Sequence, residues 1–212
     1  MHAPTIHRIY PENPQPELVL EAAAVIRKGG VVLFPTRYLY GLGADAFNAE
    51  AVGKIFALKQ RPGDKPLPVL ISNTSQLDQL VKDIPPVAAK IIEHFWPGKI
   101  TIVFAAKDSL PDNLTARTGK IGIRLAGHSV AAALVKHVEK PITGTSANVS
   151  GSAGCSRIED LDFRIAQQVD LILDAGPLKG GKGSTVVDVT GDALQMIREG
   201  EISTEEILAL IE

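Results

Sequence analysis

Short apolar runs of the kind that form β-strands are spread along the whole chain, and amphipathic helical patterns lie between them. The strand-like runs cover residues 31–34, 67–71, 100–105, 121–125, 142–145, 171–173 and 185–189. The helical patterns cover residues 17–28, 48–59, 75–81, 85–95, 129–137, 158–167 and 204–211. Strands and helices are therefore mixed without strict alternation, which predicts a mixed α/β fold.

Size and composition favour a single domain. With 212 residues, of which 45% are hydrophobic and 22% charged, the chain can build one core large enough to enclose a small molecule. The only cysteine, Cys155, excludes an internal disulfide, and the five histidines show no metal-ligand spacing. Residues 1–16 are polar, and no run approaches the ~18 apolar residues of a membrane span. We therefore expect a soluble, cytoplasmic protein.

Two polar segments follow apolar elements at widely separated places in the chain. Residues 59–67 collect the cations Lys59, Arg61 and Lys65 just past a helical pattern, and prolines stiffen the exit. Residues 143–151 end a short apolar strand in small hydroxyl and amide side chains, where a ligand can approach the backbone. Cations and close-approaching donors together indicate a site for the phosphates of a nucleotide.

Each motif taken alone has an ordinary structural explanation. A Lys-x-Arg pair is typical of a solvated helix C-terminus, and serine and asparagine routinely form the turn after a strand. The glycine-rich residues 176–183 come close to a phosphate-binding P-loop, but Gly183 follows Lys182 where serine or threonine is needed, and a strand pattern follows where a helix is needed. We therefore reject a P-loop and expect an ordinary loop there. The two ordered polar segments together favour a site.

Seven ordered motifs make the chain similar to the YrdC-like family, the threonylcarbamoyl-AMP synthases. They lie at residues 35–43, 59–67, 97–101, 122–124, 146–151, 184–188 and 198–200. The resemblance implies a single YrdC-like domain over residues 1–212, with its core at about 14–203 and a C-terminal helix at 204–211. It implies an α/β fold in which a twisted, open mixed sheet and its helices surround a large concave cavity.

The resemblance also implies a reaction. Members of the family join L-threonine, bicarbonate and ATP into threonylcarbamoyl-AMP and pyrophosphate, a nucleotidyl transfer in which Mg²⁺ enters with ATP and no organic cofactor is needed. The product serves the modification of an adenosine beside the anticodon of certain tRNAs. The expected partners are therefore these small molecules, downstream tRNA-modifying proteins and tRNA or double-stranded RNA, but no membrane.

Site residues follow from the family motifs, position by position. The resemblance implies a catalytic set of Lys59, Arg61, Ser146 and Asn148. The residues implied to bind ATP are Arg61, Lys65, Ser146, Gly154 and Arg198. Those implied to bind threonine are Tyr38, Leu70, Arg124, Gly144 and Ser184. No residue is expected to form a metal site of the protein's own. Arg124 suits its role because a guanidinium binds a carboxylate through two parallel hydrogen bonds.

One motif departs from the family pattern. Where the family has an acidic residue and then a threonine, this chain has Arg37 and Tyr38. The threonine of the family lies against the amino-acid substrate, so a phenol there would remove volume from the pocket unless it swings out. A paralogue of the YciO type, which uses ATP with another amine or acid, is therefore an alternative. A second alternative is a structured-RNA-binding module without turnover, although a net charge of -2 and 5% aromatic residues give no RNA-binding signature.

Overall fold

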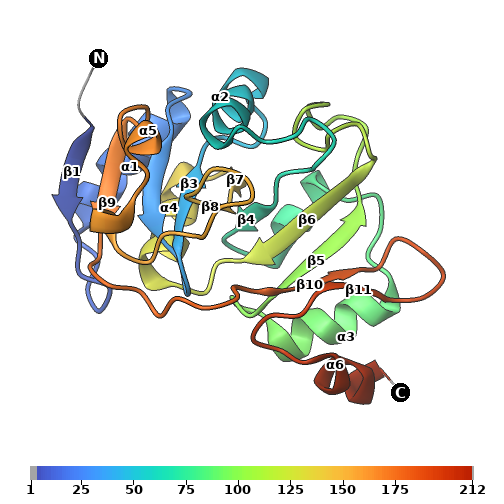
Figure 1. The fold of residues 1–212 in the computed structure, drawn as a ribbon. Coiled ribbons are helices and arrows are strands. Elements are labelled where there is room, and N and C mark those ends of the chain that lie inside the picture. The colour runs from blue at the N-terminus through green and yellow to red at the C-terminus, as the bar shows by residue number, and fades with distance from the viewer. Residues whose placement is uncertain (1–3, 212) are drawn as a thin grey trace.

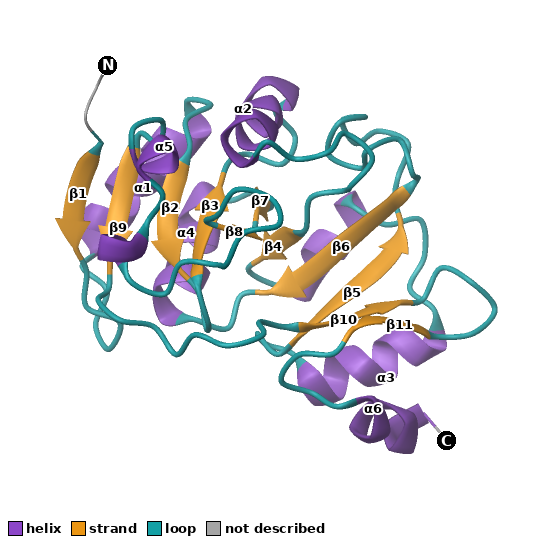
Figure 2. Cartoon of the chain, viewed as in Figure 1, coloured by secondary structure: helices purple, strands orange, loops and turns teal. Residues whose placement is uncertain are grey.

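The computed structural model describes residues 4–211, which form two mixed β-sheets with helices packed around them (Figures 1 and 2). The five-stranded sheet has the order β1 (Thr5–Arg8), β9 (Leu171–Asp174), β2 (Val32–Pro35), β3 (Tyr40–Gly43) and β8 (Thr145–Ser146). The six-stranded sheet has the order β11 (Gln195–Arg198), β10 (Thr185–Asp188), β5 (Ile100–Ala105), β6 (Lys120–Leu125), β4 (Val69–Ile71) and β7 (Ile142–Thr143). The mixed α/β class is confirmed, with the strands divided between two sheets.

The helices cover the sheets and bury their apolar faces. Helices α1 (Pro16–Arg27) and α4 (Ser129–Val138) pack against each other and bury β2, β9 and part of β4 in one apolar cluster. Helices α2 (Ala49–Lys59) and α3 (Pro86–Phe95) contribute to a larger cluster that includes residues of both sheets. Helix α6 (Thr204–Ile211) packs on α3 at the C-terminal end. This burial holds the two sheets together.

Helix α2 is placed by local signals at both of its ends. The Asn48 side chain accepts hydrogen bonds from the amides of Glu50 and Ala51, so it caps the first turn as the sequence predicts. The helix ends at Lys59 because Gln60 adopts a left-handed conformation with φ of 46°, and the next amide, that of Arg61, returns to the Phe56 carbonyl at 3.0 Å. The basic end of the helix is thereby fixed in space.

The chain crosses from one sheet to the other at Gly144. β7 pairs with β4 in the six-stranded sheet, whereas β8 pairs with β3 in the five-stranded sheet. A Cβ atom at Gly144 would lie 2.5 Å from Cγ of Leu70, so only glycine allows this close passage. The run predicted as one strand over residues 142–145 is therefore two short strands in different sheets.

Other differences from the predicted elements have physical causes. β1 and β11 were not predicted, because both are edge strands with mostly exposed side chains and lack a clear apolar alternation. β3 was not predicted as a strand either, and two of its four residues are glycines. The predicted helix over 158–167 is divided into a 3₁₀ turn, Ile158–Asp160, and α5 (Phe163–Ala166), because the Asp162 side chain caps a new start. The helix predicted over 75–81 is a 3₁₀ helix, Thr74–Gln79.

Replacing Gly200 with alanine should lower the free energy of unfolding by about 1–3 kcal/mol, the usual cost of forcing extra atoms into a packed interior. A Cβ atom there would lie 2.5 Å from backbone atoms of Gly183, Ser184 and Thr185. The Gly200 amide also donates to the buried Thr185 hydroxyl at 2.9 Å, which leaves the segment no room to move away. Urea unfolding measures the change. Gly191→Ala is the matched control, since its Cβ meets only ordinary contact; equal effects of the two substitutions would contradict the prediction.

Candidate active site

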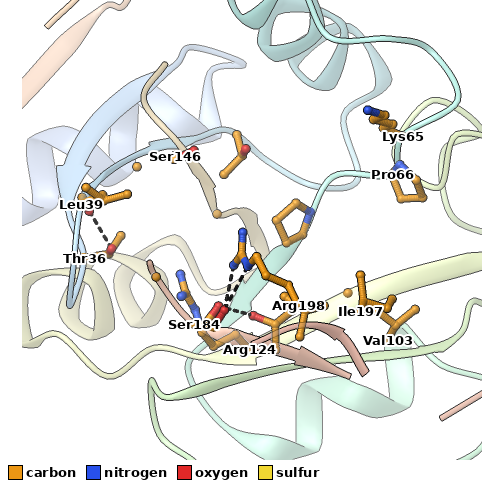
Figure 3. Close-up of a pocket in the computed structure, with 18 of the residues that line it drawn as sticks. Thr36, Leu39, Lys65, Pro66, Val103, Arg124, Ser146, Ser184, Ile197 and Arg198 are labelled. Carbon is orange, nitrogen blue, oxygen red and sulfur yellow. Dashed lines mark hydrogen bonds between the residues drawn. The ribbon is translucent and has the colours of Figure 1, made fainter. Parts of the chain in front are cut away.

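A cavity of about 570 Å³ lies between the two sheets and is lined by residues of both (Figure 3). Most of the residues expected at the site line it. They are Tyr38, Lys59, Arg61, Lys65, Arg124, Gly144, Ser146, Asn148, Ser184 and Arg198. In Figure 3, Ser146 lies across the open space from Ser184 and Arg124, and Lys65 lies at a third side. Segments that are far apart in the sequence therefore converge on one space.

Two of the expected site residues do not line this cavity. Leu70 is buried, and its side chain packs against Gly144, which does line the cavity. Gly154 lies behind the side chain of Leu39, which occupies the place where a Cβ of residue 154 would be. Both residues thus lie against residues of the cavity wall, Gly144 and Leu39, and do not line the cavity themselves.

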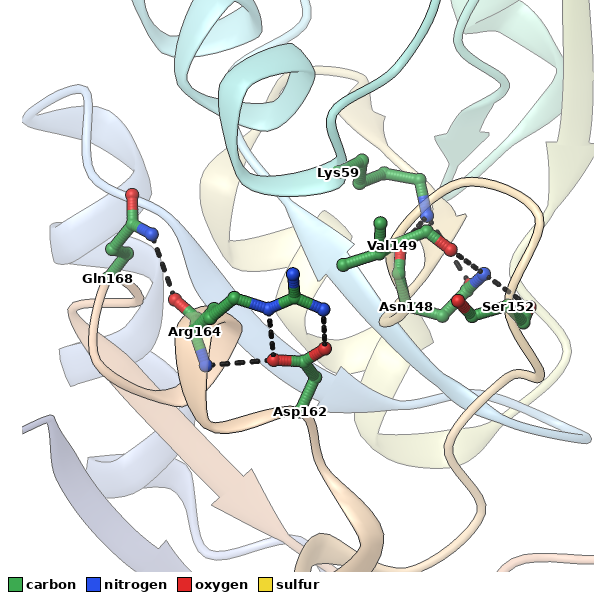
Figure 4. Close-up of polar contacts among 7 residues, drawn as sticks. All are labelled: Lys59, Asn148, Val149, Ser152, Asp162, Arg164 and Gln168. Atoms are coloured by element: carbon green, nitrogen blue, oxygen red, sulfur yellow. Dashed lines mark hydrogen bonds and ion pairs between the residues drawn. The ribbon is translucent and has the colours of Figure 1, made fainter.

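The buried Lys59 ties α2 to the loop after β8 (Figure 4). Its Nζ donates to the carbonyl oxygens of Ser146 at 2.5 Å and Asn148 at 2.7 Å, and to Oδ1 of Asn148 at 3.4 Å. In return, the Ser150 amide donates to the Lys59 carbonyl at 2.8 Å. The Lys-x-Arg and Ser-x-Asn motifs are therefore in direct contact.

Burial changes the acid–base behaviour of Lys59. Only 2% of the residue is exposed. Loss of water, together with repulsion from Arg61, lowers the pKa of Lys59 to about 8. A neutral amine has two hydrogens, whereas three acceptors surround Nζ, so the charged ammonium is the form that satisfies this arrangement near pH 7.

Arg61 organises the loop that follows α2. Its Nε donates to the Lys65 carbonyl at 2.9 Å, and its Nη2 donates to the Pro66 carbonyl at 2.7 Å. Burial lowers the pKa of Arg61, although an arginine stays charged. Within residues 4–211, Nη1 has no hydrogen-bond partner. The loop is thus closed around a guanidinium that keeps one nitrogen available to the cavity.

Arg124 presents an unpaired cation to the cavity from β6. No described residue forms a hydrogen bond or an ion pair with its side chain, and burial, with repulsion from Arg198, lowers its pKa to about 10. Ser184 lies beside it (Figure 3), with its hydroxyl 2.9 Å from that of Thr101. Arg198 donates to the Ser184 carbonyl at 2.8 Å and 3.3 Å. An anionic group bound here would supply the partner that Arg124 lacks.

The cavity also contains charged residues that the sequence analysis missed. Lys120 and Asp188 form an ion pair of 2.7 Å in its wall. Lys120, Gly122 and Arg124 all line the cavity, as expected for alternate residues on one face of a strand. This period of two was readable around Arg124 and could have identified Lys120.

Arg37 and Tyr38, the two residues that differ from the family pattern, share one hydrogen-bond partner. Tyr38 is 4% exposed and lines the cavity, and its hydroxyl donates to Glu201. The Arg37 guanidinium also binds Glu201, through Nε at 3.1 Å and Nη2 at 3.0 Å. The charge of Arg37 is therefore neutralised within the protein.

Cations dominate the lining of the cavity. Among the described residues that line it, the basic ones are Lys59, Arg61, Lys65, Lys120, Arg124, Lys182 and Arg198, and the one acidic residue is Asp188, which is already paired. A polyanion such as a triphosphate suits this lining. Among residues 4–211 no three His, Cys, Asp or Glu side chains are grouped so that they could hold a metal ion. None of the helices described is both long and apolar enough to cross a membrane.

Comparison with known proteins identifies the family to which the chain belongs. Residues 24–200 match the profile of the Sua5_yciO_yrdC family, described as "Telomere recombination". The threonylcarbamoyl-AMP synthase of Bacillus subtilis (strain 168) is 40% identical over 198 residues, which cover 91% of this chain and 56% of that protein. The chain thus spans little more than half the length of this curated relative.

Two solved structures have the same fold. The structure of Pyrococcus abyssi Sua5 complexed with L-threonine superposes with a TM-score of 0.90 at 34% identity, covering 97% of this chain and 60% of that one. Escherichia coli YciO superposes with a TM-score of 0.88 at 30% identity, covering 96% of this chain and 99% of that one. By its family profile, its relatives and its fold, the chain belongs to the Sua5/YciO/YrdC family.

Proposed function

We propose that this chain is an L-threonylcarbamoyladenylate synthase that joins L-threonine, bicarbonate and ATP and releases pyrophosphate. The main observation behind this proposal is that one cavity is lined both by Lys59 and Asn148, which contact each other, and by the unpaired Arg124. A relative named threonylcarbamoyl-AMP synthase and a relative solved with L-threonine support the choice of substrates.

The cationic side of the cavity would hold the triphosphate. Displacing pyrophosphate from an α-phosphate needs charge neutralisation and an attacking oxygen held in line, and it needs no covalent nucleophile. Lys59 would position Ser146 and Asn148, while Arg61, Lys65 and Arg198 would bind phosphate or nucleotide oxygens. Because Lys59 uses its hydrogens within the protein, its part is to fix the loop and to supply positive charge.

The part of the cavity around Arg124 and Ser184, which adjoins Arg198, would hold the amino acid. Arg124 would bind the threonine carboxylate, and Ser184, which lines the cavity beside Arg124 (Figure 3), would contact the amino acid as well. Gly144, which leaves the backbone bare at the crossing between the sheets, would let the substrate approach closely. The amine would then point toward the bicarbonate and the phosphates.

Mg²⁺ would enter with ATP, as this ion usually does when substrate phosphates supply its ligands. The donor set fits that arrangement, since the described residues of the cavity offer hydroxyls and one lysine-paired carboxylate, Asp188, which leaves the phosphates and water as the main ligands. The ion would neutralise part of the charge on the departing pyrophosphate. The described residues would bind and orient the nucleotide around it.

Pyrophosphate release by the purified protein tests the proposal. ATP, Mg²⁺ and bicarbonate are supplied with threonine, with serine, with other amino acids and with none, and mass spectrometry identifies the product. Release that requires both threonine and bicarbonate, with threonylcarbamoyl-AMP as product, is the expected result. ATP binding without any release would overturn the proposal.

A YciO-type activity with another amine or acid is the second candidate. Two observations favour it: the Arg37–Tyr38 change, of which Tyr38 lines the cavity, and the nearly full-length match to the uncharacterised E. coli protein YciO, of which the chain covers 93%. Release of pyrophosphate with an amine other than threonine in the same assay would select it.

The product would pass to proteins that modify tRNA. The basic cavity also allows contact with the phosphates of tRNA or double-stranded RNA, which a local patch can provide despite the net charge of -2. RNA binding that falls steeply with salt, without ATP turnover, would instead indicate an RNA-binding module.

Activity should depend on pH through Lys59. Burial lowers the pKa of Lys59 from 10.5 to about 8, so the ammonium loses its proton as the pH rises through 8, and with it the charge and one of its hydrogen bonds. With saturating bicarbonate, kcat/KM for ATP should therefore be level below about pH 7.5 and fall up to tenfold per pH unit above about pH 8. In Lys59→Arg, which stays charged, any remaining activity should show no such fall. A level profile to about pH 9.5 in the unmodified protein would contradict the assignment.

A further inference from the structure

Arg37, Tyr38 and Glu201 form a cluster of charge-assisted hydrogen bonds at the edge of the cavity. Glu201 binds both side chains at once, the guanidinium through two hydrogen bonds and the phenol through a third. Those bonds, Arg37 first and Tyr38 second, lower the pKa of Glu201 to about 2, so the carboxylate stays charged at any working pH. We refer to these three residues as the clasp.

The clasp joins three segments that belong to different parts of the fold. Arg37 and Tyr38 lie in the corner between β2 and β3 of the five-stranded sheet, whereas Glu201 follows β11 of the six-stranded sheet. The loop 176–183, which runs from β9 to β10, is attached as well, because the Gly180 amide donates to the Tyr38 carbonyl at 2.8 Å. The clasp therefore connects the two sheets across one end of the cavity.

Both ends of the clasp are firmly supported. Thr185 is fully buried, and its hydroxyl accepts from the amides of Gly200 at 2.9 Å and Ile202 at 3.0 Å. The residues on either side of Glu201 are thus fixed. On the other side, the Tyr38 ring has Arg37 Cζ 5.8 Å and Lys179 Nζ 5.9 Å from its centroid, within the range of cation–π attraction.

These contacts hold the phenol ring of Tyr38 in the cavity wall. To swing out, Tyr38 would have to break its bond to Glu201, leave two cations and expose a ring that is 4% exposed. Water would replace the hydrogen bond but not the burial of the aromatic ring, so the ring stays in the wall. Tyr38 and Arg124 both line the cavity. The fixed ring therefore borders the place where Arg124 would hold a carboxylate.

We propose that the Arg37–Tyr38–Glu201 clasp sets the size limit for the amino-acid substrate, with Tyr38 as the specificity-determining wall and Arg37 and Glu201 as positioning residues. This inference rests on the proposed function, in which an amino acid lies beside Arg124. The substrate class it selects is a small amino acid whose side chain fits between the ring and the rest of the wall.

Size discrimination is tested by calorimetric binding and by pyrophosphate release with glycine, serine, threonine and leucine. In Tyr38→Thr, the ratio of leucine to threonine should rise at least tenfold, both for affinity and for kcat/KM. Tenfold is the lower end of the discrimination that one methylene gives in a pocket. KM for ATP should change less than about threefold, since the wall faces the amino acid. An unchanged leucine-to-threonine ratio would overturn the specificity role.

Hydrogen exchange tests the clasp without any substrate. Glu201→Gln should speed exchange of the Gly180 amide at least tenfold, because weakening the clasp releases the corner that accepts from it. The matched control is Asp162→Asn, which weakens a two-bond Asp–Arg pair of 3.0 Å and 2.5 Å on α5 (Figure 4) and should leave Gly180 unchanged. Equal exchange at Gly180 in Glu201→Gln and in the unmodified protein would overturn the clasp.

The two readouts separate the clasp from the proposed function. Amino-acid binding that follows the size prediction, without pyrophosphate release, would count against the synthase and leave the clasp in place. No binding of any amino acid to either the unmodified protein or Tyr38→Thr would overturn the specificity role.

Discussion

Replacing Lys59 with methionine should lower pyrophosphate release by about 10²–10³-fold, the range seen when one positioned donor is lost from a catalytic site. The side chain holds two backbone carbonyls of the loop that carries Ser146 and Asn148. Without the ammonium, the loop is free to move by the ångström or so that is enough to misplace a reacting group. Positive charge beside the phosphates is lost as well.

Stability should change only moderately in this variant. The pKa of Lys59 is lowered to about 8, so burying the charge costs about 3 kcal/mol, and methionine removes that cost. The lost hydrogen bonds of the charged amine are worth about 1.5–3 kcal/mol each, which offsets that cost or exceeds it. We therefore expect the free energy of unfolding to fall by no more than about 3 kcal/mol.

Lys54→Met is the matched control for Lys59→Met. Lys54 lies on the same helix, is exposed, and contacts Glu50 and the Gly29 carbonyl away from the cavity. Its substitution should leave pyrophosphate release within about twofold, as is usual for an exposed position. If Lys59→Met retained full activity, or if both variants lost activity equally, Lys59 could not be the residue that fixes the loop. Urea unfolding of both variants gives the stability comparison.

The sequence predicted those parts of the site that depend on interactions between residues close together in the chain. Asn48 and the apolar spacing after it were sufficient to place α2 and to end it near Lys59, because capping and periodicity act within a few residues. The crossing between the two sheets, in contrast, brings Gly144 against Leu70, a residue of a separate segment. Edge strands such as β1 and β11 likewise depend on their partner strands, so their own side chains carried little signal.

Glu201, the partner of Arg37 and Tyr38, could not be predicted from the sequence. Arg37 and Glu201 are 164 residues apart in the sequence, and neither lies in a pattern that points to the other. Seen from the sequence alone, Arg37 was an unexplained reversal of charge and Tyr38 an obstruction. The fold supplies one carboxylate that accommodates both side chains, which makes the change a coherent feature of this cavity.

Replacing Arg124 with lysine should raise KM for the amino acid at least about 30-fold, corresponding to the 2 kcal/mol or more that truncating one member of a buried charge pair costs. Arg124 is a cavity cation whose side chain has no partner among the described residues, and its guanidinium can bind both oxygens of a carboxylate at once. Lysine keeps the charge but has one point-like donor group and a shorter reach. KM for ATP should change less than about threefold, because in the proposed arrangement other cations bind the phosphates.

Steady-state pyrophosphate release with threonine and ATP varied separately measures the two KM values for Arg124→Lys. Arg117→Asn is the control, since Arg117 is exposed outside the cavity, pairs with Asp112 at 3.3 Å and has a left-handed backbone that asparagine tolerates. A rise in KM for ATP that matches the rise for threonine would place Arg124 on the nucleotide. Because the guanidinium has no other partner within residues 4–211, its loss should disturb the fold little, so that a change in KM reports on the ligand itself.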